Sequence, residues 1–136
     1  MNMEKNLTNE LPKILIADDD GELRRLLRFT FGYGEFVIYT ATNGEQALQL
    51  AEELRPSAMI LDVMMPIVDG VEVCRRIKAN PLTMDIYTII LTGFDTPSTR
   101  HAIVEAKADA YLVKPFSPME LIRIVETMPS MPKGNL

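Results

Sequence analysis

The chain has 136 residues, enough for one domain with a hydrophobic core and too few for two ordinary domains. Hydrophobic residues make up 47% of it and charged residues 24%, close to the averages of soluble globular proteins. No apolar run approaches the roughly 18 residues of a membrane-spanning helix, and the polar N-terminus lacks the apolar stretch of a signal peptide. Cys74 is the single cysteine, which excludes an intrachain disulfide and a cysteine-based zinc site. We therefore expect a cytoplasmic protein with no membrane insertion.

The net charge of −5 argues against direct nucleic-acid binding, which needs a concentrated basic surface. An acidic balance is also what an unliganded cation site would produce, although most acidic proteins are acidic for solubility.

Short apolar runs alternate along the chain with segments of helical period. The expected strands are Lys13–Ala17, Phe36–Thr40, Ser57–Leu61, Tyr87–Leu91 and Ala110–Val113. All but the second are nearly continuous in apolar residues, as in parallel strands buried on both faces. The second, FVIYT, is more mixed and predicts an edge strand.

Each expected strand is followed by a helix candidate with an apolar stripe. The stripes are Leu23, Leu26, Leu27, Thr30 and Phe31; Ala47, Leu50, Ala51 and Leu54; Val73, Cys74 and Ile77; Ile103 and Val104; and Leu121, Ile124, Val125 and Met128. The last helix opens with Ser117-Pro118-Met119-Glu120, a capping box with proline at the first helical position.

This βα alternation, repeated five times, predicts an α/β fold with right-handed crossovers. The simplest arrangement at this size is a flavodoxin-like (βα)5 doubly wound parallel sheet in the order 2-1-3-4-5. We expect one domain over residues 13–127, a flexible tail over 1–12, and a tail or the start of a linker over 128–136. In such folds the functional site lies at the carboxyl ends of the strands.

Polar residues follow four of these strands. They are Asp18, Asp19 and Asp20 after the first strand, Asp62 after the third, Thr92 after the fourth and Lys114 after the fifth. Carboxylates gathered in one crevice raise each other's pKa values unless a cation neutralises them. Carboxylates, water and a backbone carbonyl are the ligands that Mg²⁺ prefers. The sequence therefore predicts a divalent-metal site at this edge of the sheet.

These residue types suit phosphoryl transfer. A carboxylate is able to attack phosphorus and form an aspartyl-phosphate, while a metal and a lysine offset the charge of the phosphoryl oxygens. Such chemistry needs mostly positioning and electrostatics. His101, the single histidine, lies in the middle of an expected helix and is predicted to face solvent, so it does not compete as a nucleophile.

The motifs ILIADDDGELRRLL, MILDVMMPIVDG, TIILTG and AYLVKPF, in this order, resemble the response-regulator receiver family of two-component signalling, over Lys13 to Thr127. The resemblance implies that Asp62 is the phosphoacceptor and that Mg²⁺ or Mn²⁺ binds at Asp62, at Asp19 directly and at Asp18 through water. It also implies a metal contact from the backbone carbonyl of Met64 and a cis Lys114-Pro115 bond. Further implied roles are phosphoryl contacts from Thr92 and Lys114 and a switch formed by Thr92 and Tyr111.

Such a receiver is a signalling phosphoacceptor and not a conventional enzyme, because it catalyses only its own phosphorylation and slow dephosphorylation. The implied phosphodonor is a sensor histidine kinase or a histidine phosphotransfer protein. The implied output face consists of the fourth helix, the fifth strand and the fifth helix, around Tyr111. Because few residues follow Thr127, we expect the target to be another protein or the chain to be a receiver detached from its output domain.

Two other functions stay open. Asp18 and Asp20 form the aspartate-x-aspartate pair of haloacid-dehalogenase-type phosphatases, but Glu22 stands where that family has threonine or valine. The other alternative is a docking module that keeps the fold without phosphorylation. Individual aspartates also have simple structural interpretations: Asp20 either caps a helix or has an outer site role, and Asp69 is expected to begin a helix.

Three positions depart from the receiver pattern. Lys107 stands where the family usually has glycine, and Gly21 replaces a frequent proline. Ala110 stands where many members that dimerise through the output face have aspartate, which weakens the case for that dimer.

Overall fold

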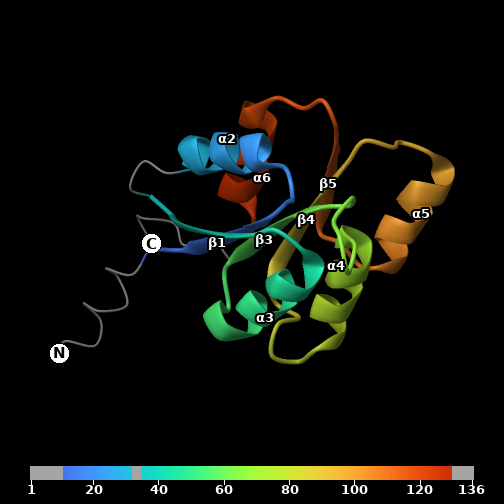
Figure 1. Ribbon diagram of the computed structural model, residues 1–136, viewed down its shortest axis with the longest axis horizontal. Coiled ribbons are helices and arrows are strands. Elements are labelled where there is room, and N and C mark those ends of the chain that lie inside the picture. Colours follow the sequence, from blue (N-terminus) through green and yellow to red (C-terminus); the bar gives the residue numbers. More distant parts are fainter. Residues whose placement is uncertain (1–10, 32–34, 130–136) are drawn as a thin grey trace.

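The computed structural model describes residues 11–31 and 35–129. These residues form a parallel sheet in the order β2-β1-β3-β4-β5 (Figure 1), which confirms the expected topology. The strands are β1 (Lys13–Ala17), β2 (Val37–Ala41), β3 (Ala58–Asp62), β4 (Tyr87–Thr92) and β5 (Ala110–Val113). The mixed β2 lies at one edge, as its composition predicts, and β3 lies in the centre with all its residues buried.

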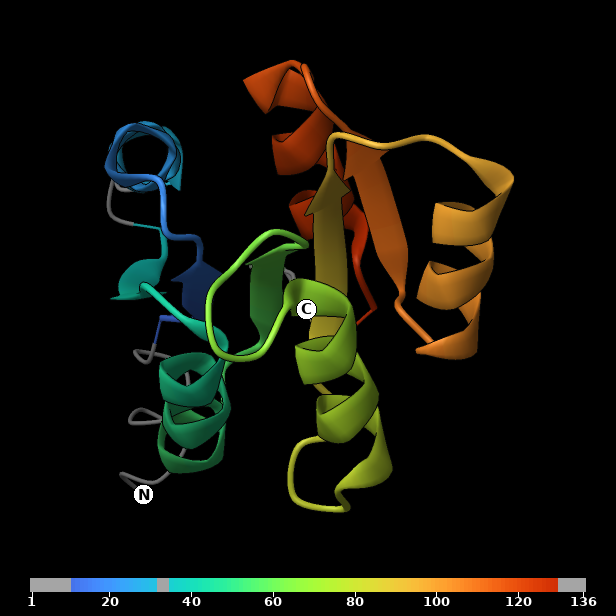
Figure 2. The ribbon, with the colours of Figure 1, turned by 45° about the vertical axis from the view of Figure 1, so that its right-hand side comes forward.

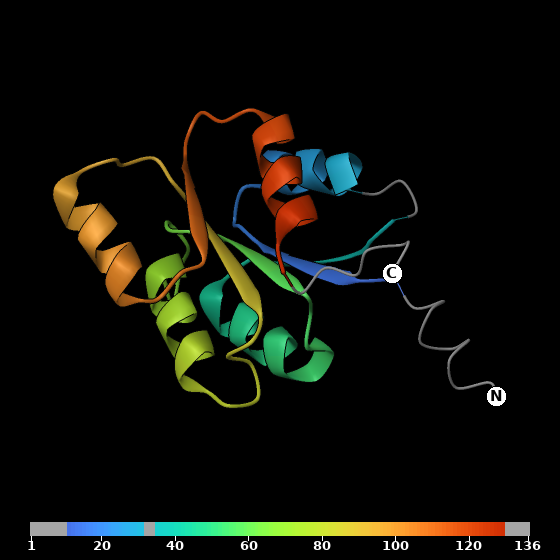
Figure 3. The same ribbon diagram turned by 180° about the vertical axis from the view of Figure 1, so that it is seen from behind.

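Helices cover both faces of the sheet. The helices α2 (Gly21–Phe31) and α6 (Pro118–Thr127) lie on one face, and α3 (Gly44–Leu54), α4 (Gly70–Ala79) and α5 (Pro97–Glu105) lie on the other (Figure 1, Figure 2 and Figure 3). Alternate strand residues supply the two cores, because successive side chains of a strand point to opposite faces. Ile14 and Ile60 pack with α2 and α6, whereas Leu15 and Met59 pack with the other three helices.

The N-termini of the helices are capped as the sequence suggests. Asp69 caps α4 by accepting a hydrogen bond from the amide of Glu72 at 2.9 Å, which confirms its role as a helix-start residue. Ser117 and Glu120 form the expected capping box at the start of α6. No helix in the described parts of the chain is long and apolar enough to span a membrane.

Two residues of the predicted apolar stripes are exposed, so that part of the prediction is wrong. Leu26 and Val104 both face solvent, while their neighbours Leu27 and Ile103 are buried. Consecutive helical residues differ by about 100° in direction, so only one of each pair reaches the sheet.

Helix α5 ends at a residue in the left-handed conformation. Lys107 has φ 65°, its amide donates to the carbonyl of Val104 at 2.9 Å, and the amide of Ala108 donates to the carbonyl of Ile103 at 3.3 Å. These two bonds form a Schellman motif, in which the left-handed position is usually glycine. Lys107 thus adopts the left-handed conformation that is usual for glycine, although it is not glycine as in most of the family.

Candidate functional site

The carboxyl edge of the sheet carries three converging aspartates. Asp18 follows β1 and Asp62 ends β3, and these strands are neighbours in the sheet. One carboxylate oxygen from each of Asp18, Asp19 and Asp62 lies within 4.8 Å of the other two. Asp18 and Asp62 are buried, at 1% and 4% exposure, and Asp19 is exposed. The structure therefore brings together three predicted site residues in a group open to solvent through Asp19.

Asp18 has one satisfied and one unsatisfied carboxylate oxygen. Its Oδ1 accepts a hydrogen bond from the amide of Asp20 at 2.6 Å, while Oδ2 is buried without a hydrogen-bond partner. Burial raises the pKa of Asp18 to about 7, with a further upward effect from Asp62, opposed by the Asp20 amide and by Lys114. A buried carboxylate with an unpartnered oxygen favours either a bound proton or a bound cation.

Asp62 is fixed in orientation by contacts to both of its oxygens. Lys114 Nζ donates to Oδ2 at 2.6 Å, and the amide of Met64 donates to Oδ1 at 3.0 Å. Lys114 follows β5, and its own amide donates to the carbonyl of Thr92 at 2.7 Å, which ties three strand ends together. The Lys114-Pro115 bond is cis, as the resemblance implies.

Thr92 is the last residue of β4 and is fully buried. Its hydroxyl accepts from the amide of Phe94 at 3.0 Å and donates to the carbonyl of Phe94 at 3.1 Å. The structure thus places this side chain at the expected strand end, with its hydrogen bonds directed to its own loop and not to Asp62. Nothing lies within 4 Å of the position that a Cβ on the next residue, Gly93, would occupy.

Comparison with known proteins agrees with this geometry. Residues 14–126 match the model of the response regulator receiver domain. The chain belongs to this family. The chain is 41% identical over 110 residues to the response regulator MprA of Mycolicibacterium vanbaalenii, which covers 81% of this chain and 47% of the relative. The chain therefore spans about half the length of the curated relatives that it matches.

Solved structures show the same fold. A receiver domain of a sensor histidine kinase from Pseudomonas aeruginosa, with a magnesium ion coordinated in its active-site cleft, superposes with a TM-score of 0.78 at 26% identity, covering 86% of this chain and 96% of that one. A DNA-binding response regulator of the LuxR family from Staphylococcus aureus has a TM-score of 0.78 at 34% identity, covering 85% of this chain and 97% of that one.

The remaining predicted residues of this receiver lie in the same region. Met64 follows Asp62 in the β3–α4 loop, with an exposed side chain and its amide on the Asp62 carboxylate. Tyr111 lies in β5 opposite Ile90 of β4 and is half-buried against the core under α3, α4 and α5. The metal contact of the Met64 carbonyl and the switching role of Tyr111 stay predictions.

Three titratable residues that the sequence analysis considered, Asp20, Asp69 and His101, lie outside the acidic cluster. Asp20 lies outside it and accepts a hydrogen bond from the amide of Glu22 at 2.9 Å, so it caps the first turn of α2. His101 is exposed on α5, as predicted. Asp69 is committed to capping α4.

Arg24 is a site residue that the sequence reasoning missed. Its Nη1 donates to the backbone carbonyl of Asp18 at 2.6 Å, and its own amide donates to the carbonyl of Asp20 at 3.0 Å. The available signal was an arginine in the first turn of the helix that follows the acidic cluster. A main-chain acceptor for its side chain leaves no trace in sequence patterns, so only the structure shows the contact.

The acidic cluster fits a divalent cation. Three carboxylates, one of them with an unpartnered buried oxygen, provide the hard oxygen donors that Mg²⁺ or Mn²⁺ prefers. Lys114 balances one of the carboxylates, which leaves the cluster negative overall when all three are ionised.

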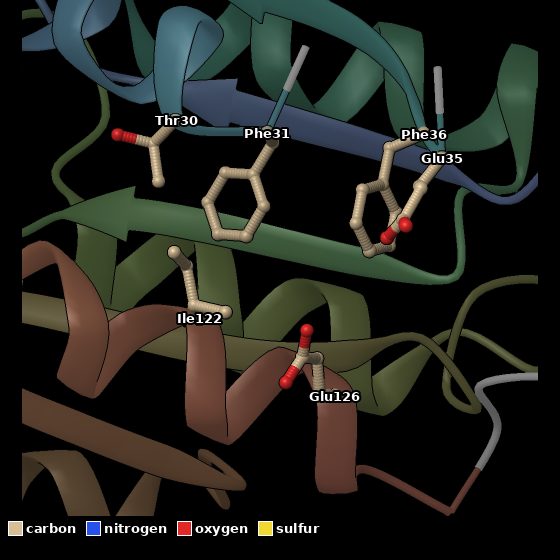
Figure 4. A pocket seen from close by; sticks show the side chains of 6 residues that line it. All are labelled: Thr30, Phe31, Glu35, Phe36, Ile122 and Glu126. Carbon is tan, nitrogen blue, oxygen red and sulfur yellow. The ribbon is translucent and has the colours of Figure 1, made fainter. Parts of the chain in front are cut away.

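Two cavities lie near α2, at opposite ends of the sheet. A groove of about 400 Å³ borders Lys114 at the carboxyl edge and is lined also by Asp20, Leu23, Leu26, Pro115 and Phe116. The other, about 220 Å³, lies between the ends of α2 and α6, where Phe31, Phe36 and Ile122 form an apolar lining beside Glu35 and Glu126 (Figure 4). The described residues that line the second cavity include no lysine or arginine, so it does not suit a phosphoryl group.

Proposed function

We propose that this receiver accepts a phosphoryl group on Asp62 in a divalent-metal-dependent reaction. The observation that carries the proposal is the fixed Asp62 carboxylate, which bonds Lys114 and the Met64 amide beside the acidic pair Asp18 and Asp19. The coordinated magnesium in the receiver domain from Pseudomonas aeruginosa supports a metal at this edge of the sheet.

The chemistry follows from the positions of the side chains. A carboxylate oxygen of Asp62 attacks phosphorus, and the bond between phosphorus and the donor atom breaks, with its electron pair leaving on the donor. Lys114, already 2.6 Å from Asp62 Oδ2, is placed to contact the transferred phosphoryl oxygens. Asp18, Asp19, Asp62 and the Met64 carbonyl would hold the metal ion, which supplies charge neutralisation at the phosphoryl group.

The signal is proposed to pass through Thr92 and Tyr111. The Thr92 hydroxyl is engaged by the backbone of Phe94, and its transfer to a phosphoryl oxygen would release that loop. Tyr111 lies on the neighbouring strand, beside the helix that follows the loop. The output face would then consist of α5, β5 and α6.

The proposed donor is a sensor histidine kinase or a histidine phosphotransfer protein. The groove beside Lys114 offers such a protein an apolar surface next to the acceptor, through Leu23, Leu26 and Phe116. Because the curated relatives are about twice as long as the matched region, the output step is proposed to belong to a partner protein or to an output domain. The solved neighbour from Staphylococcus aureus is a DNA-binding response regulator, whereas we expect no direct nucleic-acid contact from residues 13–127 of this chain.

Incubation with acetyl phosphate and Mg²⁺, followed by intact mass, tests the proposal. We expect one added phosphoryl group in the wild type and none in Asp62→Asn or after chelation. Asp69→Asn serves as the matched control, because Asp69 caps α4 and its carboxylate is not part of the acidic cluster, so its variant should still be labelled. Label on Asp18 or Asp20 would support the phosphatase chemistry instead, and no label at all would support a docking module.

A further inference from the structure

Arg24 holds the main chain of the loop that carries the metal-binding aspartates. The loop over residues 18–20 is fixed at its start by the Asp18 amide, which donates to the carbonyl of Ala41 at 3.0 Å. Arg24 then fixes it twice, through the side-chain bond to the Asp18 carbonyl and the main-chain bond to the Asp20 carbonyl. Among the described residues, Arg24 is the one outside this loop whose side chain forms a hydrogen bond to the loop backbone.

The direction of the Arg24 guanidinium is informative. Asp18, Asp19, Asp20 and Glu22 all lie within six residues of it along the chain, yet it makes no ion pair with a carboxylate within the described ranges. A surface arginine beside so many carboxylates is usually drawn to one of them. Here the guanidinium binds a neutral carbonyl, so the three aspartates of the cluster stay free of it.

The guanidinium groups of Arg24 and Arg25 both lie close to Gly21. A Cβ at Gly21 would lie 3.5 Å from Arg24 Nη2 and 3.5 Å from Arg25 Nη1, so both guanidinium groups lie over this residue. Arg25 is exposed, and its guanidinium makes no hydrogen bond to another described residue. The two arginines therefore place similar charge near the same loop, and only Arg24 bonds the loop.

We propose that Arg24 is a positioning residue, which presents Asp18 and Asp19 to the divalent cation by holding the Asp18 carbonyl. This inference rests on the proposed function, because it assumes that the acidic cluster binds the metal. A hydrogen bond from a charged donor to a loop carbonyl restricts the loop, and less of the binding energy is then spent on ordering the ligands.

An electrostatic role and a positioning role of Arg24 predict opposite changes in metal affinity when its side chain is removed. Removing a positive charge beside a cation site should tighten cation binding by Coulomb's law. Releasing the Asp18 carbonyl should weaken binding, because the two aspartates lose their fixed arrangement. The sign of the change in metal affinity therefore separates a positioning role from a purely electrostatic one.

The test measures Mn²⁺ affinity from the electron paramagnetic resonance signal of the free ion, in Arg24→Met and in Arg25→Met. We expect Arg24→Met to weaken Mn²⁺ binding on the order of threefold to tenfold, the size of one hydrogen bond. Arg25→Met should leave the affinity unchanged or slightly higher, since it removes only charge. A second readout is the amide NMR spectrum of the metal-free protein, in which Arg24→Met should shift Asp18 to Asp20 more than Arg25→Met does.

Equal or tighter Mn²⁺ binding in Arg24→Met would overturn the inference while leaving the proposed function intact. Absence of Mn²⁺ binding in the wild type would contradict the proposed function itself. If Arg24→Met does not fold, Arg24→Lys decides the matter, because it keeps the charge on a shorter side chain with a single donor group. We expect Arg24→Lys to weaken Mn²⁺ binding, and an affinity equal to the wild type would overturn the inference.

Discussion

Replacing Lys107 with glycine should stabilise the domain. Lys107 occupies the left-handed position of the Schellman motif that ends α5, with φ 65°. The following residues cannot relax this turn, because Asp109 is held by the amide of Thr88 at 2.8 Å and by Lys78 Nζ at 2.7 Å. The side chain of Lys107 is exposed and therefore contributes little packing. The backbone conformation is thus the main energetic feature of this position.

The expected gain is the difference between two terms. A residue with a Cβ loses roughly 1–2 kcal/mol in the left-handed conformation, and glycine does not. Glycine in turn gives the unfolded chain more freedom, which costs about 0.4–1 kcal/mol. We therefore expect Lys107→Gly to raise the free energy of unfolding by about 0.5–1 kcal/mol.

Urea unfolding followed by circular dichroism measures this gain as a higher midpoint at unchanged slope. Lys107→Ala is the matched control, because it removes the same charge and keeps the left-handed penalty. It should be no more stable than the wild type. If Lys107→Gly is no more stable than Lys107→Ala, the left-handed conformation of this turn carries no strain and the prediction is wrong.

Three further predictions concern the site and its loops. Burial raises the pKa of Asp18 from 3.8 to about 7. Between these two pH values the folded metal-free protein keeps a proton on Asp18 that the unfolded chain releases. The stability of the fold should therefore fall as the pH rises from about 4 to about 7. Asp18→Asn should remove this fall and unfold at higher urea than the wild type at pH 8 without metal; an unchanged pH profile would contradict it. Ile67 is β-branched, 71% exposed and has φ 74°, so Ile67→Gly should be more stable in the same assay, whereas a loss of stability would show that its side chain packs usefully. Met64 and Phe94, which stand two residues after Asp62 and Thr92, have exposed apolar side chains that cannot orient a water by hydrogen bonding. The phosphorylated protein should therefore lose its label over minutes or longer, and Met64→Asn with Phe94→Glu should shorten that lifetime. Label lost within seconds from the wild type, or decay unaffected by the double substitution, would contradict a role of these two side chains in slowing hydrolysis.

The topology could be predicted because four strands are almost wholly apolar. Residues such as Ile60 and Leu61 leave no polar face, which indicates a strand buried on both sides and hence a parallel sheet with helices on both faces. The acidic cluster followed from the same argument, since the carboxyl ends of neighbouring parallel strands meet at one edge.

What could not be predicted depends on side-chain direction. Leu26 and Val104 have the composition of core residues, but the packing of their helices turns them to solvent. Arg24 binds a backbone carbonyl, and Thr92 binds the backbone of its own loop. Backbone acceptors are present at every position of a sequence, so no residue pattern distinguishes these contacts from their alternatives.

The two loops that flank Asp62 differ in how closely they are packed at their glycines. At the start of α4, a Cβ on Gly70 would lie only 2.2 Å from the carbonyl oxygen of Asp62, so this helix abuts the acceptor strand without spare room. In the loop after β4, nothing lies within 4 Å of the position that a Cβ on Gly93 would occupy. The packing around Asp62 is therefore tight at the start of α4 and leaves room at residue 93 in the loop before α5. We expect a structural response to a change in charge at Asp62 to be accommodated in the loop between β4 and α5, where the packing leaves room, and not at the start of α4.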